Sequence, residues 1–154
     1  MIKKLVAQVL IVSLTCSSLI AGHPEFDKLI TMAKQEGGEI SPKHLKEMLD
    51  SEKSVIILDV REENQRAEGE IFYSTTESIT RGNLEFEIFN KIKDKNAVIV
   101  TYCRSGGRGA LAAQTLKKLG YVNAVNLNGG LKGWAKEGYP IETGLGITFL
   151  SKEQ

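Results

Sequence analysis

A cysteine at the start of a glycine-rich segment is the feature of this 154-residue chain best suited to chemistry. The segment begins at Cys103 and reads Cys-Arg-Ser-Gly-Gly-Arg, between an apolar run at 97–102 and a helical pattern at 110–119. The thiolate is the nucleophilic form of cysteine. Glycine-rich backbone amides, the positive end of a helix dipole and two guanidinium groups all stabilise negative charge. The pattern therefore predicts a nucleophilic Cys103 in an anion-binding loop.

Five residues after the cysteine are candidate ligands for an anionic substrate. They are Arg104, Ser105, Gly106, Gly107 and Arg108. The glycines permit the backbone angles that turn successive amides towards one centre. At the predicted helix start, Arg108 is placed to hold an oxyanion with two N–H groups, and Arg104 is placed to meet the incoming substrate.

Other kinds of cysteine or metal chemistry lack the residues they need. The two histidines, His23 and His44, fall in an N-terminal segment and an early predicted helix, which argues against a Cys/His catalytic pair. One cysteine without acidic or histidine residues at ligand spacing does not make a closed zinc site. The sequence also lacks the C-x-x-C pair of an internal redox disulfide. We therefore expect no metal and no cofactor.

The elements that position the loop alternate between strands and helices. Apolar runs rich in β-branched residues predict buried strands at 54–60, 97–102 and 122–127, with an edge strand at 39–40. Helical spacing and end signals predict helices at 42–49, 62–68, 83–92, 110–119 and 131–137. This order implies an α/β fold with a central parallel sheet and helices on both faces. Residues 73–82 show no clear period, so we expect a loop at the rim of the site.

Three residues outside the cysteine loop are candidate supports for the site. Asp59 and Arg61 follow a predicted strand, and the carboxyl ends of parallel strands meet at one edge of a sheet. Asp59 is equally suited to hydrogen-bond the loop that follows it, and Arg61 to pair with a carboxylate. Arg81 lies in the expected rim loop, where it either reaches the pocket or is solvated.

The N-terminal residues have the form of a secretory signal peptide. Lys3 and Lys4 precede an apolar stretch that ends at Ile20, and small residues follow. We therefore predict a signal peptide at 1–21, a lead-in helix at 22–37, one domain at 38–145 and a C-terminal tail at 146–154. The protein would be exported, to the periplasm in a bacterium. Retention as a membrane anchor and lipidation at Cys16 are the alternatives, and the first of these would bring the chain to a membrane.

Composition limits the partners of the mature chain. Removal of the signal takes away two of the 20 basic residues and none of the 19 acidic ones, so the formal charge changes from +1 to −1. A chain of such balanced charge is not suited to nucleic acid. Cys103 would then be the single cysteine of an exported protein, and an unpaired exported thiol is more often reactive than structural.

The ordered set of motifs from about residue 40 to 142 resembles a rhodanese-type sulfurtransferase domain. The matching fragments are Asp59-Val60-Arg61-Glu62, Gly69 with Ile71, Arg81-Gly82, the loop 103–108, Gly120-Tyr121, and Gly129-Gly130 with Trp134. The resemblance implies that Cys103 takes sulfane sulfur from a small anionic donor such as thiosulfate and carries it as a persulfide. It also implies that the sulfur passes to cyanide or to a thiol, including the thiol of a protein partner, and that the loop amides stabilise the persulfide.

Two other functions remain open from the sequence. Cysteine phosphatases and arsenate reductases of related architecture have five residues between the cysteine and the arginine, whereas four separate Cys103 from Arg108. A non-catalytic module that docks to a partner in sulfur or redox signalling would have a Cys103 that never loads sulfur.

The chain also departs from the family pattern, because Glu70 replaces a usual histidine and Thr80 a usual proline. A carboxylate near the loop would repel an anionic donor.

Overall fold

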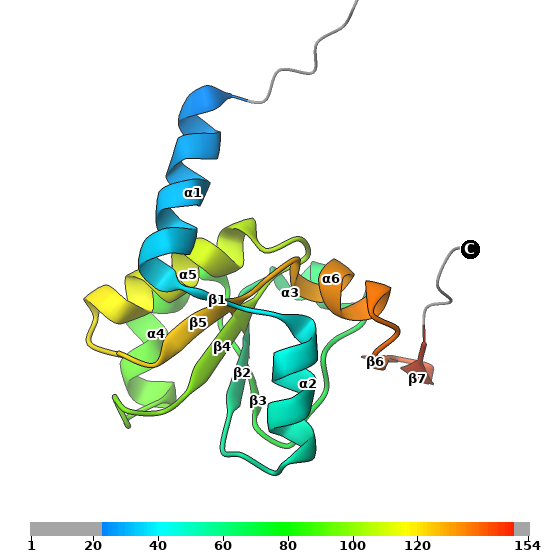
Figure 1. Ribbon diagram of the computed structural model, residues 1–154. Helices are drawn as coiled ribbons and strands as arrows, with labels where there is room; N and C mark the ends of the chain where they lie inside the picture. The colour runs from blue at the N-terminus through cyan, green and yellow to red at the C-terminus, as the bar shows by residue number, and fades with distance from the viewer. Residues whose placement is uncertain (1–22, 150–154) are drawn as a thin grey trace, which may run out of the picture.

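The computed structural model describes residues 23–149 and has a central five-stranded parallel sheet between helices (Figure 1). The helices are α1 (Pro24–Gly37), α2 (Pro42–Asp50), α3 (Glu63–Arg66), α4 (Leu84–Lys91), α5 (Gly107–Lys118) and α6 (Gly130–Lys136), with a 3-10 helix η1 (Arg81–Asn83) before α4. The strands are β1 (Glu39–Ile40), β2 (Ile56–Asp59), β3 (Thr76–Ser78), β4 (Ile99–Tyr102), β5 (Ala124–Leu127), β6 (Ile141–Thr143) and β7 (Gly146–Thr148). The sheet order is β1-β5-β4-β2-β3, which confirms the predicted α/β class.

Alternation along the central strands builds two separate cores. Ile57 and Val100 lie in a cluster with residues of α2 and α6, whereas Leu58 and Ile99 lie in a cluster with residues of α4 and α5. Successive side chains of a strand point to opposite faces, so helices must cover both sides of such a sheet. Because both faces of β2 and β4 are buried, their sequences are mainly apolar along their length rather than alternating.

The strand register brings Asp59 and the start of the cysteine loop to the same end of the sheet, where the carboxyl ends of the strands lie. Asp59, the last residue of β2, pairs with Tyr102, the last residue of β4, and Cys103 comes next in the chain. The carboxyl ends of parallel strands therefore meet where the cysteine loop begins, as expected for an open α/β sheet.

The predicted loop at 73–82 is wrong in its middle part. Residues Thr76–Ser78 form β3, which pairs in parallel with β2 and completes the edge of the sheet. The strand is short and polar, and all three of its residues are half-buried, so no apolar alternation marks it in the sequence. Such short polar strands are common at sheet edges.

A small antiparallel hairpin follows the last helix. Strands β6 and β7 pair with each other, and Glu142 of β6 forms an isolated bridge with Glu70. The predicted boundary between the domain and a C-terminal tail at residue 145 falls in the turn of this hairpin.

Residues 23–149 contain no helix that is both long and apolar enough to cross a membrane. The predicted signal peptide at 1–21 lies outside the described residues.

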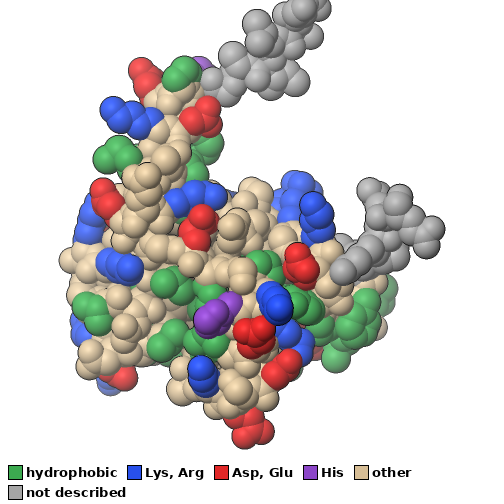
Figure 2. All heavy atoms as spheres, in the orientation of Figure 1, with side chains coloured by type: hydrophobic (Ala, Val, Ile, Leu, Met, Phe, Trp, Pro, Cys, Tyr) green, Lys and Arg blue, Asp and Glu red, His purple; other side chains and the backbone are tan. Residues whose placement is uncertain are grey.

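The predicted lead-in helix is present as α1, which projects from the body of the domain (Figures 1 and 2). Its last turns pack on α5, where Ala33 and Gly37 are buried. A Cβ placed on Gly37 would lie 2.9 Å from the backbone nitrogen of Gln114 and 3.1 Å from the Cβ of Ala113. The two helices approach this closely because position 37 has no side chain.

We expect Gly37→Ala to destabilise the protein even though alanine favours helices. The added methyl group meets the α5 backbone, and overpacking of this kind costs about 1–3 kcal/mol. Urea unfolding followed by circular dichroism measures the change. Gly82→Ala is the matched control, because a Cβ at Gly82 has no neighbour within 4 Å. Equal stability of the two variants would mean that α1 does not depend on this close packing.

Candidate active site

The cysteine loop links the end of β4 to the start of α5. Cys103 is 2% exposed, and its Sγ accepts a hydrogen bond of 3.2 Å from the backbone amide of Gly106. Gly106 has a φ of +100°, a left-handed conformation that favours glycine, and it is the N-cap residue of α5. Of the loop amides predicted to surround the sulfur, this is the one that contacts it.

Helix α5 begins earlier than the sequence pattern suggested. Its first residue is Gly107 rather than Ala110, so Gly107 and Arg108 belong to the first helical turn. The thiol therefore lies at the N-terminal end of a 12-residue helix, where the helix dipole favours an anion. Arg108 is half-buried there, whereas Ser105 is exposed on the loop.

Amides at the start of helix α6 donate hydrogen bonds to the carbonyls of the same loop. The amide of Leu131 donates to the carbonyl of Cys103 at 2.8 Å, and the amide of Lys132 donates to the carbonyl of Arg104 at 3.0 Å. In a trans peptide the N–H points opposite to the carbonyl, so the amides of Arg104 and Ser105 are directed away from α6. The contact leaves no room at Gly130, where a Cβ would lie 2.3 Å from the Cys103 carbonyl oxygen.

Asp59 and Arg61 form a fully buried ion pair with each other. The Nε and Nη2 atoms of Arg61 donate to the Asp59 carboxylate at 3.0 and 2.6 Å, and the Arg61 backbone amide donates to it at 2.9 Å. Burial alone would lower the pKa of Arg61, but the hydrogen bond and charge of Asp59 outweigh it and raise that pKa. The guanidinium therefore stays charged inside the protein.

The same guanidinium fixes the segment that runs beside the cysteine loop. Its Nη1 donates to the carbonyl of Gln65 at 3.1 Å, and its Nη2 donates to the carbonyl of Gly69 at 2.8 Å. It also lies 5.4 Å from the ring centre of Tyr102, the residue before the cysteine. The side-chain hydrogen bonds of Arg61 thus go to Asp59 and to this segment, which gives the pair a positioning role.

Tyr102 is held in its neutral form. Its hydroxyl accepts a hydrogen bond of 3.3 Å from the amide of Ile71. Burial raises the pKa of Tyr102 far above the ordinary range, and the negative charge and hydrogen bond of Asp59 raise it further. A phenol with so high a pKa does not act as a general base at neutral pH.

Arg81 does not reach the cysteine loop in this structure. Its Nη1 pairs with Glu85 of α4 at 3.1 Å, and its Nη2 donates to the hydroxyl of Thr115 at 2.9 Å. Thr115 lies eight residues along α5 from Gly107, which corresponds to about 12 Å. Arg81 therefore joins η1, α4 and α5 at a distance from the thiol.

The acidic residue at the loop is Glu68, which the sequence did not single out. Its carboxylate lies 3.2 Å from the Nε of Arg104, and both side chains are about half exposed, at 46% and 53%. Glu70, by contrast, is held through its backbone, which exchanges two hydrogen bonds of 2.7 and 2.8 Å with Glu142. No motif marks Glu68, because its contact depends on where the buried Arg61 places the chain.

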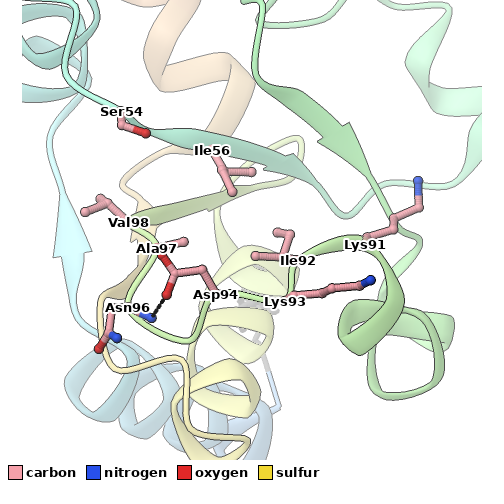
Figure 3. A pocket seen from close by; sticks show the side chains of 9 residues that line it. All are labelled: Ser54, Ile56, Lys91, Ile92, Lys93, Asp94, Asn96, Ala97 and Val98. Carbon is pink, nitrogen blue, oxygen red and sulfur yellow. Dashed lines mark hydrogen bonds between the residues drawn. The ribbon is translucent and has the colours of Figure 1, made fainter.

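A hollow of about 420 Å³ lies at the opposite end of the sheet (Figure 3). It is lined by Ser54, Ile56, Lys91, Ile92, Lys93, Asp94, Asn96, Ala97 and Val98. These residues precede or begin β2 and β4, whereas Cys103 follows the carboxyl end of β4. Within residues 23–149, no three His, Cys, Asp or Glu side chains are grouped so as to hold a metal ion.

Comparison with known proteins gives one consistent family. A family model described as a rhodanese-like domain matches residues 41–137. The chain is 32% identical over 103 residues to a sulfurtransferase of Allochromatium vinosum, with 67% of this chain and 92% of that protein covered. It is 33% identical over 108 residues to a probable adenylyltransferase/sulfurtransferase, MoeZ, of Mycobacterium tuberculosis, with 68% of this chain covered. The match spans only 26% of that longer relative.

Solved structures resemble the chain over most of its length. The polysulfide-sulfur transferase homodimer of Wolinella succinogenes is 27% identical with a TM-score of 0.67, and 76% of this chain and 86% of that one are covered. A protein of unknown function from Rhodopseudomonas palustris, described as a possible tyrosine phosphatase, is 25% identical with a TM-score of 0.66. That match covers 81% of this chain and 97% of the other.

We expect Arg61→Met to destabilise the protein by about 3–5 kcal/mol, because it leaves the Asp59 carboxylate buried without its cation. The free energy of unfolding in urea measures the loss. Lys91→Met serves as the control, since it removes a partly exposed ion pair with Glu77 whose contribution is at most about 1 kcal/mol. A loss for Arg61→Met no larger than the control would show that the buried pair does not organise this edge.

We expect Gly130→Ala to disturb the cysteine loop selectively. The added Cβ meets the Cys103 carbonyl and the Gly106 amide, so the loop must shift away from α6. Position 130 also has a φ of +57°, which costs a residue other than glycine about 1 kcal/mol. The rate at which iodoacetamide alkylates Cys103 should differ from wild type by several-fold. Gly144→Ala, where a Cβ has no neighbour within 4 Å, should leave that rate unchanged.

Proposed function

The chain belongs to the rhodanese-like domain family, and from that premise we propose that it is a sulfurtransferase whose Cys103 carries sulfane sulfur as a persulfide. Two kinds of observation support the proposal. Relatives at about 30% identity are named sulfurtransferases, and one of them, from Allochromatium vinosum, is matched over nearly its whole length. The second is the geometry around the sulfur.

One hydrogen bond carries the argument. The Gly106 amide donates to the Cys103 sulfur at 3.2 Å, at the N-terminal end of α5. An amide at a helix N-terminus favours an anion over a neutral thiol. The same site would stabilise the negative charge when it moves out by one sulfur atom, from the thiolate to the persulfide.

With thiosulfate as donor, the loading step needs no proton transfer. The Cys103 thiolate attacks the outer sulfur, an S–S bond forms, and the S–S bond of thiosulfate breaks with its electron pair remaining on sulfite. One thiolate and one dianion become one persulfide anion and one dianion, so the charges balance. Cyanide then takes the outer sulfur as thiocyanate, or a thiolate takes it as a new persulfide, and the Cys103 thiolate returns. A site in which the phenol of Tyr102 stays neutral is sufficient for this chemistry.

The physiological acceptor would be a thiol, of a small molecule or of a partner protein. The similar structures include the polysulfide-sulfur transferase of Wolinella succinogenes. Lys3, Lys4 and the apolar stretch after them support the further proposal that the protein is exported. In an exported protein, storage as a persulfide also keeps the thiol from other oxidation.

Phosphoryl transfer is the second candidate, favoured by the likeness to the possible tyrosine phosphatase of Rhodopseudomonas palustris. Two features of this chain weigh against it. Four residues separate Cys103 from Arg108, a shorter loop than in phosphatases of related architecture. Cys103 is also 2% exposed, which suits the narrow outer sulfur of a donor better than a tetrahedral phosphoryl group.

We expect thiosulfate to add one sulfur atom to the reduced 154-residue chain, as measured by intact mass. The experiment uses a Cys16→Ser background so that Cys103 is the single thiol. Cyanide should remove the added sulfur and release thiocyanate. Cys103→Ser should show no gain, and Arg108→Ala should load more slowly because it lacks one cation for the donor.

The other functions give different results in the same protein. Absence of loading with hydrolysis of an aryl phosphate would support the phosphatase. Absence of both would support a docking module, in which Cys103 never carries sulfur.

A further inference from the structure

The exposed ion pair between Glu68 and Arg104, here called the rim pair, includes the residue that directly follows Cys103 in the chain. Arg104 follows Cys103 directly, and its Nε is 3.2 Å from the Glu68 carboxylate. The sequence placed Arg104 as a cation for an incoming anionic substrate. In the structure, the guanidinium of Arg104 is already paired with the carboxylate of Glu68.

The backbones that carry the rim pair are held firmly, whereas its side chains are not. On one side, Arg61 hydrogen-bonds the carbonyls of Gln65 and Gly69, which flank Glu68. On the other, the carbonyl of Arg104 accepts the amide of Lys132 at 3.0 Å. Both side chains are about half in solvent, where an ion pair is weak and its partners exchange readily. The pair is therefore positioned to open without any movement of the loop.

We propose that Glu68 is a specificity-determining residue that competes with the anionic sulfur donor for Arg104. The donor must displace the Glu68 carboxylate, and it then remains close to that negative charge. Both effects grow with the charge of the donor, so Glu68 disfavours a dianion such as thiosulfate relative to a monoanion such as benzenethiosulfonate. This inference rests on the proposed function, because it names the class of donor that the same site prefers.

The kinetic test compares Glu68→Gln with the parent chain in the Cys16→Ser background. The KM for thiosulfate should fall about two- to five-fold, the range that corresponds to one exposed ion pair, while kcat changes by less than about two-fold. The KM for benzenethiosulfonate should fall less, and the effect should fade at about 1 M salt. Glu63→Gln, on the exposed start of α3, removes a charge from the same segment and should change neither KM.

A second comparison separates competition for Arg104 from simple repulsion. In an Arg104→Gln background, Glu68→Gln should change the KM for thiosulfate much less than in the parent chain, because the contested cation is gone. An equal change in both backgrounds would overturn the proposal and leave only a long-range effect of charge. An unchanged KM for thiosulfate in Glu68→Gln would overturn it as well.

A measurement that needs no sulfur transfer keeps this proposal distinct from the proposed function. Iodoacetate and iodoacetamide alkylate the same thiol but differ in charge, so the ratio of their rates at Cys103 reports on anion access. Mass spectrometry of the peptide containing Cys103 gives both rates. Glu68→Gln should raise the iodoacetate-to-iodoacetamide ratio about two-fold or more, and Glu63→Gln should not. If the ratio rises in a chain that loads no sulfur, the proposed function fails and the anion competition stands; an unchanged ratio overturns the competition.

Discussion

The buried ion pair of Asp59 and Arg61 is the interaction on which the site depends. Two ions in a protein interior each lose several kcal/mol of hydration, and only close, fully hydrogen-bonded geometry offsets that loss. Arg61 meets this condition with a two-atom contact to Asp59 and with two backbone carbonyls. Those carbonyls belong to the segment that carries Glu68. A pair at the end of β2 thus fixes a surface residue near a thiol at the end of β4, because both strands end at the same edge.

The cysteine loop divides its polar groups between two helices. The carbonyls of Cys103 and Arg104 accept amides from the start of α6, and the sulfur accepts the amide of Gly106 at the start of α5. A loop with unsatisfied carbonyls near a thiolate would repel the negative charge it has to stabilise. The glycines make this division possible, since Gly106 takes a left-handed conformation and Gly130 lets α6 approach the loop.

The sequence was sufficient to predict those features that arise from periodicity and from local capping. Apolar runs and helix end signals located the buried strands and most of the helices, and at the start of α2 the Ser41 hydroxyl accepts the amide of His44. It was not sufficient for β3, whose three half-buried polar residues depend on pairing with β2. The sequence left Arg81 open between pocket and solvent, and its contact with Thr115 joins residues 34 positions apart. Glu68 was missed because its contact with Arg104 joins residues 36 positions apart in the sequence.

A carrier of sulfur has to bind an anion and then release another. If thiosulfate is the donor, sulfite must leave the site before an acceptor can approach, and strong binding of every anion would slow that exchange. Interactions that stabilise donor and transition state equally lower KM without raising kcat, so weaker binding at the rim carries no necessary cost in turnover. Under the proposed function, a carboxylate on Arg104 would weaken binding in this uniform way, while the Gly106 amide contacts the sulfur itself. The separation of these two contacts would let the rim pair select the donor while the loop stabilises the persulfide.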